Sequence, residues 1–65
     1  MQIQQVEKET ATIHVSKEEL VILNNVLNEV CNGLYLNEFS MRVGTPRENV
    51  KDLLAQIGKI IDAME

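Results

Sequence analysis

Cysteine and histidine are almost absent from this chain of 65 residues, which has one of each, Cys31 and His14. A single cysteine excludes an internal disulfide, and one cysteine with one histidine cannot supply the ligand set of a structural zinc site. A domain of this size buries only about 60% of the surface that its unfolded chain exposes. The chain must therefore be stabilised by good helix packing, by oligomerisation, or by both.

The sequence also has no long apolar run and no glycine-rich phosphate-binding loop. No segment approaches the ~20 apolar residues of a membrane span. The N-terminal segment has no basic region followed by an apolar core, so we expect no signal peptide and a cytoplasmic location. The net charge of −4 argues against strong nucleic-acid binding and is compatible with binding a basic protein surface.

The N-terminal segment alternates polar and apolar residues. In residues 10–15, TATIHV, every second side chain is apolar and two of these are β-branched, which predicts a strand with one buried face. Residues 2–6, QIQQV, could form a second strand, but no glycine marks a turn. Residues 1–9 are therefore either the first strand of a hairpin or flexible. Without a hairpin, the strand would be an open edge that pairs with another chain, such as a second copy.

The pattern S-x-x-E at Ser16 and Glu19 predicts the start of a first helix. In such a capping box each residue bonds to the backbone N–H of the other. We expect a helix over residues 17–32, ended by Gly33 in a left-handed conformation. Its apolar face consists of Leu20, Leu23, Val26, Leu27, Val30 and Cys31.

Two further helices are predicted. Asn37 can cap a short helix over residues 38–43, and Thr45 with Glu48 forms a second capping box before a helix over residues 46–63. The apolar stripe of the last helix is Val50, Leu53, Leu54, Ile57, Ile60, Ile61 and Met64. The predicted fold is a single, mainly α domain with an N-terminal β-strand or ribbon, in the order β-α-α-α, with long first and third helices and a short second one.

The third helix has more apolar side chains than one short helix can cover. We therefore expect a homodimer; the alternative is a monomer in which the strand and first helix cover everything. The candidate dimer residues are Ile13, Val15, Ile57, Ile60, Ile61 and Met64.

No arrangement of residues indicates an enzyme. A nucleophile needs a base within hydrogen-bond reach, and nothing in the spacing brings Cys31 and His14 together. A cysteine on an apolar helix face is usually a core residue. The acidic residues lie mostly at helix starts, where the helix dipole favours them. We expect no catalytic residue, no metal and no cofactor.

Asparagines form a stripe on the first helix. Asn24, Asn28 and Asn32 lie one turn apart with Asn25 beside them, and we expect them to face away from the core. Asparagine is a poor helix former, and a solvated face normally carries Lys and Glu. An amide costs less to desolvate than a charge. The stripe could bind a partner, bond to the segment that follows it, or face water. The candidate partner-binding residues are Asn24, Asn25, Asn28, Glu29, Asn32, Tyr35 and Glu38.

Residues 38–54, EFSMRVGTPRENVKDLL, resemble a helix-turn-helix, with Gly44 at the turn. The resemblance implies DNA contacts from the start of the third helix. Glu48 and Asp52 depart from it, because carboxylates repel phosphates. The residues that would contact DNA are Arg47, Asn49 and Lys51.

The segments TATIHVSKEEL and GTPRENV also resemble ribbon-helix-helix repressors, which read DNA with a strand paired across a dimer. The strand residues that would face DNA are Thr10, Thr12 and His14, and none is Arg or Lys. The insert LYLNEFSMRVG between the long helices departs from that compact pattern as well.

Residues 20–50 as a whole resemble a small group of bacterial proteins with the pattern L-x-x-L-N-N-x-L-N-E-V-C-N-G, then a phenylalanine, R-[VIL]-G and an acidic helix start. The resemblance covers about half of the chain. It implies a small soluble bacterial protein of a genomic-conflict or immunity type. We therefore expect a non-enzymatic protein-binding module, an immunity protein or small inhibitor of a toxin or defence enzyme, that acts by surface occlusion as a homodimer. The alternative is a DNA-binding transcriptional regulator.

Overall fold

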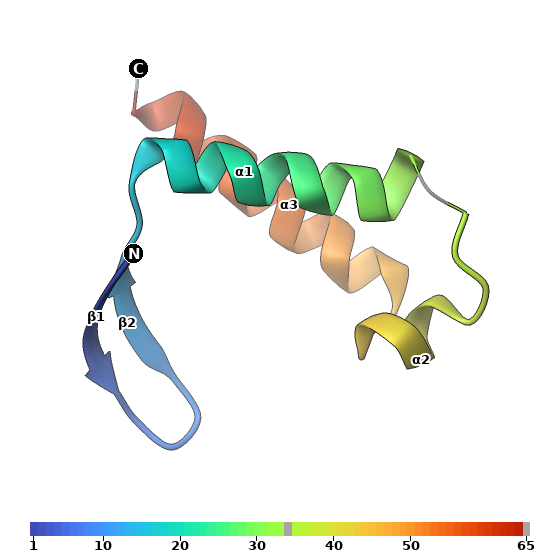
Figure 1. Cartoon of the computed structure of the whole chain (residues 1–65), viewed down its shortest axis with the longest axis horizontal. Coiled ribbons are helices and arrows are strands. Elements are labelled where there is room, and N and C mark those ends of the chain that lie inside the picture. The colour runs from blue at the N-terminus through green and yellow to red at the C-terminus, as the bar shows by residue number, and fades with distance from the viewer. Residues whose placement is uncertain (34, 65) are drawn as a thin grey trace.

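A computed structural model describes residues 1–33 and 35–64 of the chain. A β-hairpin is followed by three helices, and the hairpin extends away from them (Figure 1). The elements are β1 (Gln2–Val6), β2 (Ala11–His14), α1 (Lys17–Asn28) with a π-helical turn η1 (Glu29–Gly33), α2 (Phe39–Val43) and α3 (Arg47–Ala63). The predicted mainly α fold in the order β-α-α-α is confirmed, and its N-terminal part is a two-stranded ribbon.

The turn of the hairpin is built without glycine. Val6 pairs with Ala11, and the N–H of Glu7 donates to the carbonyl of Thr10 at 2.8 Å. The Thr10 hydroxyl donates to the carboxylate of Glu7 at 3.2 Å, and the Gln5 amide donates to the same carboxylate at 2.9 Å. The Glu7 side chain therefore closes the turn that the sequence pattern left undecided.

A β-bulge decides which side chains share a face of the hairpin. Ile3 pairs with Ile13 and Val6 with Ala11, with a register shift between Ile3 and Gln5. Residues three apart on a regular strand point to opposite faces, and one extra residue in the strand reverses this. The bulge thus places Ile3, Val6, Ala11 and Ile13 on one apolar face.

The start of α1 is the predicted capping box. The Glu19 N–H donates to the Ser16 hydroxyl at 3.1 Å, and the Ser16 N–H donates to the Glu19 carboxylate at 2.9 Å. The predicted end of this helix is wrong in detail. Gly33 is not left-handed but closes the π-helical turn η1, where the Glu29 carboxyl group lies against it.

The predicted cap of α2 is also wrong. Its N-cap is Glu38, not Asn37, and it makes no side-chain hydrogen bond. Glu38 has a φ of 55°, a left-handed conformation that is unusual for any residue with a Cβ. At the other end Gly44, with a φ of 92°, stops the helix as the sequence predicts.

The predicted capping box of α3 does not form. Pro46 is the N-cap and has no side-chain cap bond, so the helix begins at Arg47, one residue later than predicted. The Thr45 hydroxyl instead accepts a hydrogen bond from the side-chain amide of Asn49 at 2.8 Å.

The core lies between α1 and α3, which run antiparallel, and continues to α2 (Figure 1). It is small for a chain with so many apolar residues. Among the described residues, the buried side chains are Leu20, Cys31, Phe39, Val50 and Ile57. Cys31 is therefore a core residue, as predicted. In the part of the chain that the structure describes, no helix is long and apolar enough to span a membrane.

Candidate protein-binding surfaces

Arg47 joins the ends of the three helices. Its guanidinium group lies 4.4 Å from the centre of the Phe39 ring and donates a hydrogen bond to the backbone carbonyl of Cys31. A basic side chain often binds the free carbonyls at the end of a helix. Here it satisfies one in η1, which gives a physical reason for the missing left-handed glycine cap.

This position changes the interpretation of Arg47. The helix-turn-helix resemblance places it among the DNA contacts, but its side chain is half-buried and bonded within its own chain. Asn49 and Lys51 remain exposed. The local pattern could not reveal the Arg47 contacts, because Cys31 lies sixteen residues earlier in the chain.

The connector between η1 and α2, residues 35–38, carries an exposed aromatic side chain. Tyr35 is 87% exposed, the highest value among the large apolar side chains of the described residues. The left-handed Glu38 follows it, and Phe39 then turns into the core. Holding a non-glycine residue in this conformation costs about 1–2 kcal/mol, and such strained residues cluster at functional sites.

The asparagine stripe is narrower than predicted. Asn25, Asn28 and Asn32 are exposed, whereas Asn24 is half-buried at the edge of the core. At about 100° per residue, Asn24 lies closer to Leu20 than to Asn25, which explains its burial. The side-chain amide of Asn32 donates to that of Asn28 at 3.0 Å.

These amides and the connector form what we call the amide surface: Asn25, Asn28, Glu29, Asn32, Tyr35 and Glu38, all of them exposed. Six of the seven predicted partner-binding residues belong to it. Asn24 is the exception. The surface holds two acidic side chains and no basic one.

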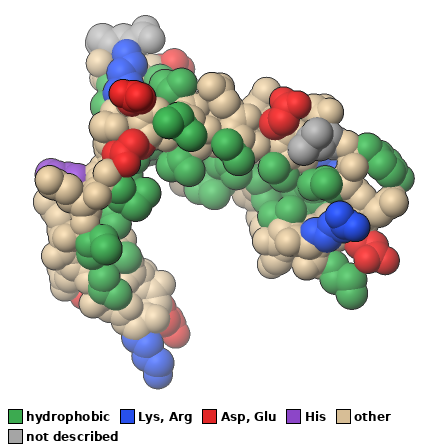
Figure 2. All heavy atoms as spheres, in the orientation of Figure 1, with side chains coloured by type: hydrophobic (Ala, Val, Ile, Leu, Met, Phe, Trp, Pro, Cys, Tyr) green, Lys and Arg blue, Asp and Glu red, His purple; other side chains and the backbone are tan. Residues whose placement is uncertain are grey.

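A second surface is apolar and lies on the other side of α1. Leu23 and Val26 are roughly half a turn around the helix from Asn28, and both are exposed. On α3, Leu53, Ile60 and Met64 are exposed on the same face of the antiparallel pair. We call these five residues the helix-pair face. In Figure 2 a band of hydrophobic side chains runs from the hairpin along the helices.

The predicted dimer residues divide into two groups in the structure. Ile13, Ile60 and Met64 are exposed. Ile57 is buried in the chain's own core, and Val15 and Ile61 are half-buried. The apolar stripe on α3 therefore has two parts. Its centre, with Ile57, packs on α1, and its edge, with Ile60 and Met64, faces outward. Sequence reasoning missed Ile3, Val6, Leu23, Val26 and Leu53, although the spacing of Leu53, Ile60 and Met64 could have shown this edge.

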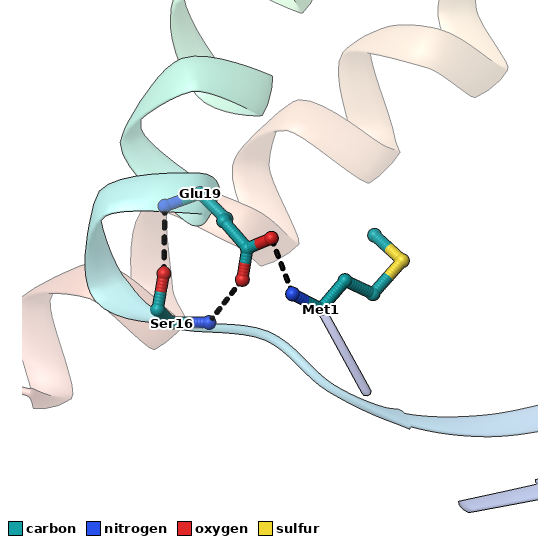
Figure 3. A network of polar contacts seen from close by, with 3 residues as sticks. All are labelled: Met1, Ser16 and Glu19. Carbon is teal, nitrogen blue, oxygen red and sulfur yellow. Dashed lines mark hydrogen bonds and ion pairs between the residues drawn. The ribbon is translucent and has the colours of Figure 1, made fainter. Parts of the chain in front are cut away.

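An ion pair holds the hairpin to α1. The Met1 ammonium group lies 2.5 Å from a carboxylate oxygen of Glu19, whose other oxygen belongs to the capping box (Figure 3). The hydrogen bond from this ammonium group, with that from the Ser16 N–H, lowers the pKa of Glu19 from 4.5 to about 2.

Cys31 and His14, the two residues considered as a nucleophile and a base, lie in different parts of the structure. Cys31 is buried where α1 meets α2, whereas His14 lies on the surface of the hairpin, where its ring is 3.3 Å from the amide of Gln4. Residues 1–33 and 35–64 contain no cluster of three His, Cys, Asp or Glu side chains that could hold a metal ion.

The chain matches no protein-family model, and it has no significant match among curated proteins or among solved structures. Functional inference therefore depends on the geometry of its surfaces.

Proposed function

We propose that this chain is a non-enzymatic protein-binding module, and that it acts as an immunity protein or small inhibitor that covers a surface of a toxin or defence enzyme. The observation that carries the proposal is the 87% exposure of Tyr35 on a connector whose backbone is held in a strained conformation. The resemblance of residues 20–50 to small bacterial proteins of the immunity type supports the class of partner.

The chemistry of the amide surface suits a protein partner. Tyrosine gives a large contact area at low entropic cost and is enriched among the residues that dominate binding energies. Leu36, the neighbour of Tyr35, packs on the core cluster of Cys31, Phe39 and Val50 and so anchors the connector, while the Tyr35 side chain itself stays exposed. The neutral amides of Asn25, Asn28 and Asn32 on the preceding helix can be desolvated cheaply and can both donate and accept hydrogen bonds.

Charge indicates the kind of partner surface. Glu29 and Glu38 flank Tyr35 in the sequence, and the chain has a net charge of −4. Complementary charge raises association rates and suppresses wrong partners. We therefore expect the partner to present a basic surface to the amide surface.

Affinity capture with matched variants tests the proposal. Wild-type chain and the variants Tyr35→Ala, Asn28→Lys and Gln2→Lys are immobilised and exposed to lysate of the bacterium that carries the chain. We expect one partner that wild type and Gln2→Lys retain and the other two variants lose. Gln2→Lys is the control, because it adds the same charge at an exposed amide on the hairpin. Equal capture by all four chains, with intact helical circular dichroism, would show that the amide surface is not the binding site.

The DNA-binding alternative has less support from the geometry. Arg47, its strongest candidate for a phosphate contact, is bonded inside the chain, and the strand residues Thr10, Thr12 and His14 include no Lys or Arg. Lys51 is the remaining basic candidate. Neutralisation of phosphates by basic side chains supplies most of the affinity of such proteins.

A further inference from the structure

Within residues 1–33 and 35–64, nothing covers the apolar face of the hairpin. Ile3 is 72% exposed and Val6 69% exposed, and Ile13, which pairs with Ile3, is also exposed. A two-stranded hairpin alone in water is at best marginally stable, and it needs further strands or packing against a helix. The β-bulge places these side chains on one face, and packing of that face against another apolar surface would stabilise the hairpin.

The helix-pair face lacks a cover too. Leu23, Val26, Leu53, Ile60 and Met64 are between about two-fifths and just over half exposed, beside a core in which five side chains of the described residues are buried. Small domains with so little core, no disulfide and no metal usually gain stability from another chain. Figure 1 shows why the hairpin cannot cover this face itself: it extends away from the helices.

We propose that a second copy of this chain covers both faces, with the hairpin of each protomer packed on the helix-pair face of the other. The two surfaces can cover each other, because the hairpin needs a helix to pack on and the helix pair needs an apolar surface against it. A two-fold axis makes the same contact twice and closes the assembly at two copies. A second copy covers both faces with surfaces that this chain itself carries.

The available area fits such a dimer. The eight large apolar side chains of the two faces, Ala11 left aside, are on average about half exposed. Complete burial of one aliphatic side chain removes roughly 60–120 Å² of apolar surface, so together they offer roughly 250–500 Å² per protomer. A standard interface buries about 800 Å² per partner, and about 65% of a homodimer interface is apolar. The two faces therefore supply between about half and nearly all of the apolar part of such an interface.

This dimer is separate from the proposed function. The helix-pair face lies on the side of α1 opposite Asn28, so a dimer formed through it leaves Asn28 open to a partner in both protomers. Loss of the dimer and loss of the partner would be observed with different variants.

Sedimentation velocity of the full chain, from about 1 to 100 μM, tests the proposal with four chains. They are the wild type, Val6→Lys on the hairpin, Ile60→Glu on α3, and Thr12→Lys as a control on the opposite face of the hairpin. We expect wild type and Thr12→Lys to sediment as dimers at the upper end of this range. Val6→Lys and Ile60→Glu should each raise the dimer dissociation constant at least tenfold, with unchanged helical circular dichroism.

A mixing experiment distinguishes exchanged hairpins from any other dimer. If the hairpin of one copy contacts α3 of the other, an equimolar mixture of Val6→Lys and Ile60→Glu forms a heterodimer, in which one contact is native and the other brings lysine to glutamate. Dimers should therefore reappear on mixing. A wild type that is monomeric at 100 μM, or a mixture that stays monomeric, would overturn the proposal.

Discussion

Arg47 is the residue whose role the structure changes most. The sequence pattern assigns it to a DNA-reading helix, whereas its side chain stacks on Phe39 and binds the carbonyl of Cys31. Local sequence predicts which residues begin a helix, but it cannot predict a contact between residues 31 and 47, since that contact depends on how the helices pack.

Replacement of Arg47 by alanine should destabilise the fold. The charged hydrogen bond and the stacking contact together predict a loss of about 2 kcal/mol in the free energy of unfolding. Arg47→Lys should recover little of it, because an ammonium group cannot stack as a planar guanidinium does. Urea unfolding followed by circular dichroism measures the change. Lys51→Ala, an exposed basic residue on the same helix, is the control, and an equal loss in that variant would contradict this role.

Glu19 gives the fold a dependence on acid pH. Its pKa is about 2 in the folded chain against 4.5 for the free group, so its contribution to stability is complete above pH 4.5. The contribution is lost as the pH falls from 4.5 towards 2, because the carboxylate is then protonated and its ion pair with Met1 is lost.

The variant Glu19→Gln isolates this effect, since glutamine can still take part in the capping box. Between pH 5 and pH 2 its thermal midpoint should fall less than that of the wild type. Glu18→Gln removes the same charge on the same turn and should behave as the wild type does. Parallel curves for all three chains would show that the ion pair does not contribute.

At the scale of elements, the successes and failures of prediction have separate physical causes. The capping box at Ser16 and the stop at Gly44 depend on residues within one turn, and the structure confirms them. The alternation correctly predicts a strand, but the buried face predicted for it is wrong, because every residue of β1 and β2 is exposed on a hairpin that extends away from the helices. The caps expected at Asn37 and Thr45 fail, although both residue types suit the position. The bulge and the π-helical turn have no signal in local propensity.

Substitutions at the two left-handed residues that flank α2, Glu38 and Gly44, should change the stability of the chain in opposite directions. Glu38→Gly should stabilise the chain by up to about 1 kcal/mol, because glycine adopts a positive φ without the steric cost of a Cβ. Gly44→Ala should destabilise it by about 1–2 kcal/mol for the same reason. No neighbouring atom within 4 Å would meet the new Cβ, so backbone strain alone is measured. Denaturant midpoints compare the two variants, and a shared sign would refute this interpretation.

At the scale of the whole molecule, the two long helices have different surfaces on their two sides. The sequence predicts both the amide stripe and the excess of apolar side chains on the last helix. It does not predict which apolar residues face outward. Ile57 is buried and Ile60 is exposed although both belong to the same stripe, because the rotation of α3 against α1 decides which of them faces the core. Six of the seven predicted partner residues are exposed. The helical period accounts for those on the first helix, whereas Tyr35 and Glu38 lie on the connector, where the period does not apply.

The acidic charge and the internal bonding of Arg47 predict that DNA is not a ligand. A labelled duplex should show no mobility shift at micromolar protein and ~50 mM salt, conditions under which non-specific binding by basic proteins is already visible. A shift that weakens as salt increases would favour the regulator instead. Lys51→Ala should then reduce it.

The central claim is that Tyr35 contacts another protein. A photoreactive phenylalanine analogue in place of Tyr35, introduced in the cell that carries the chain, tests it directly; the same analogue at Lys8, in the hairpin turn, serves as the control. We predict that irradiation produces one adduct of higher mass from position 35 and none of that mass from position 8. No adduct at position 35, or the same adduct from both positions, would contradict the account.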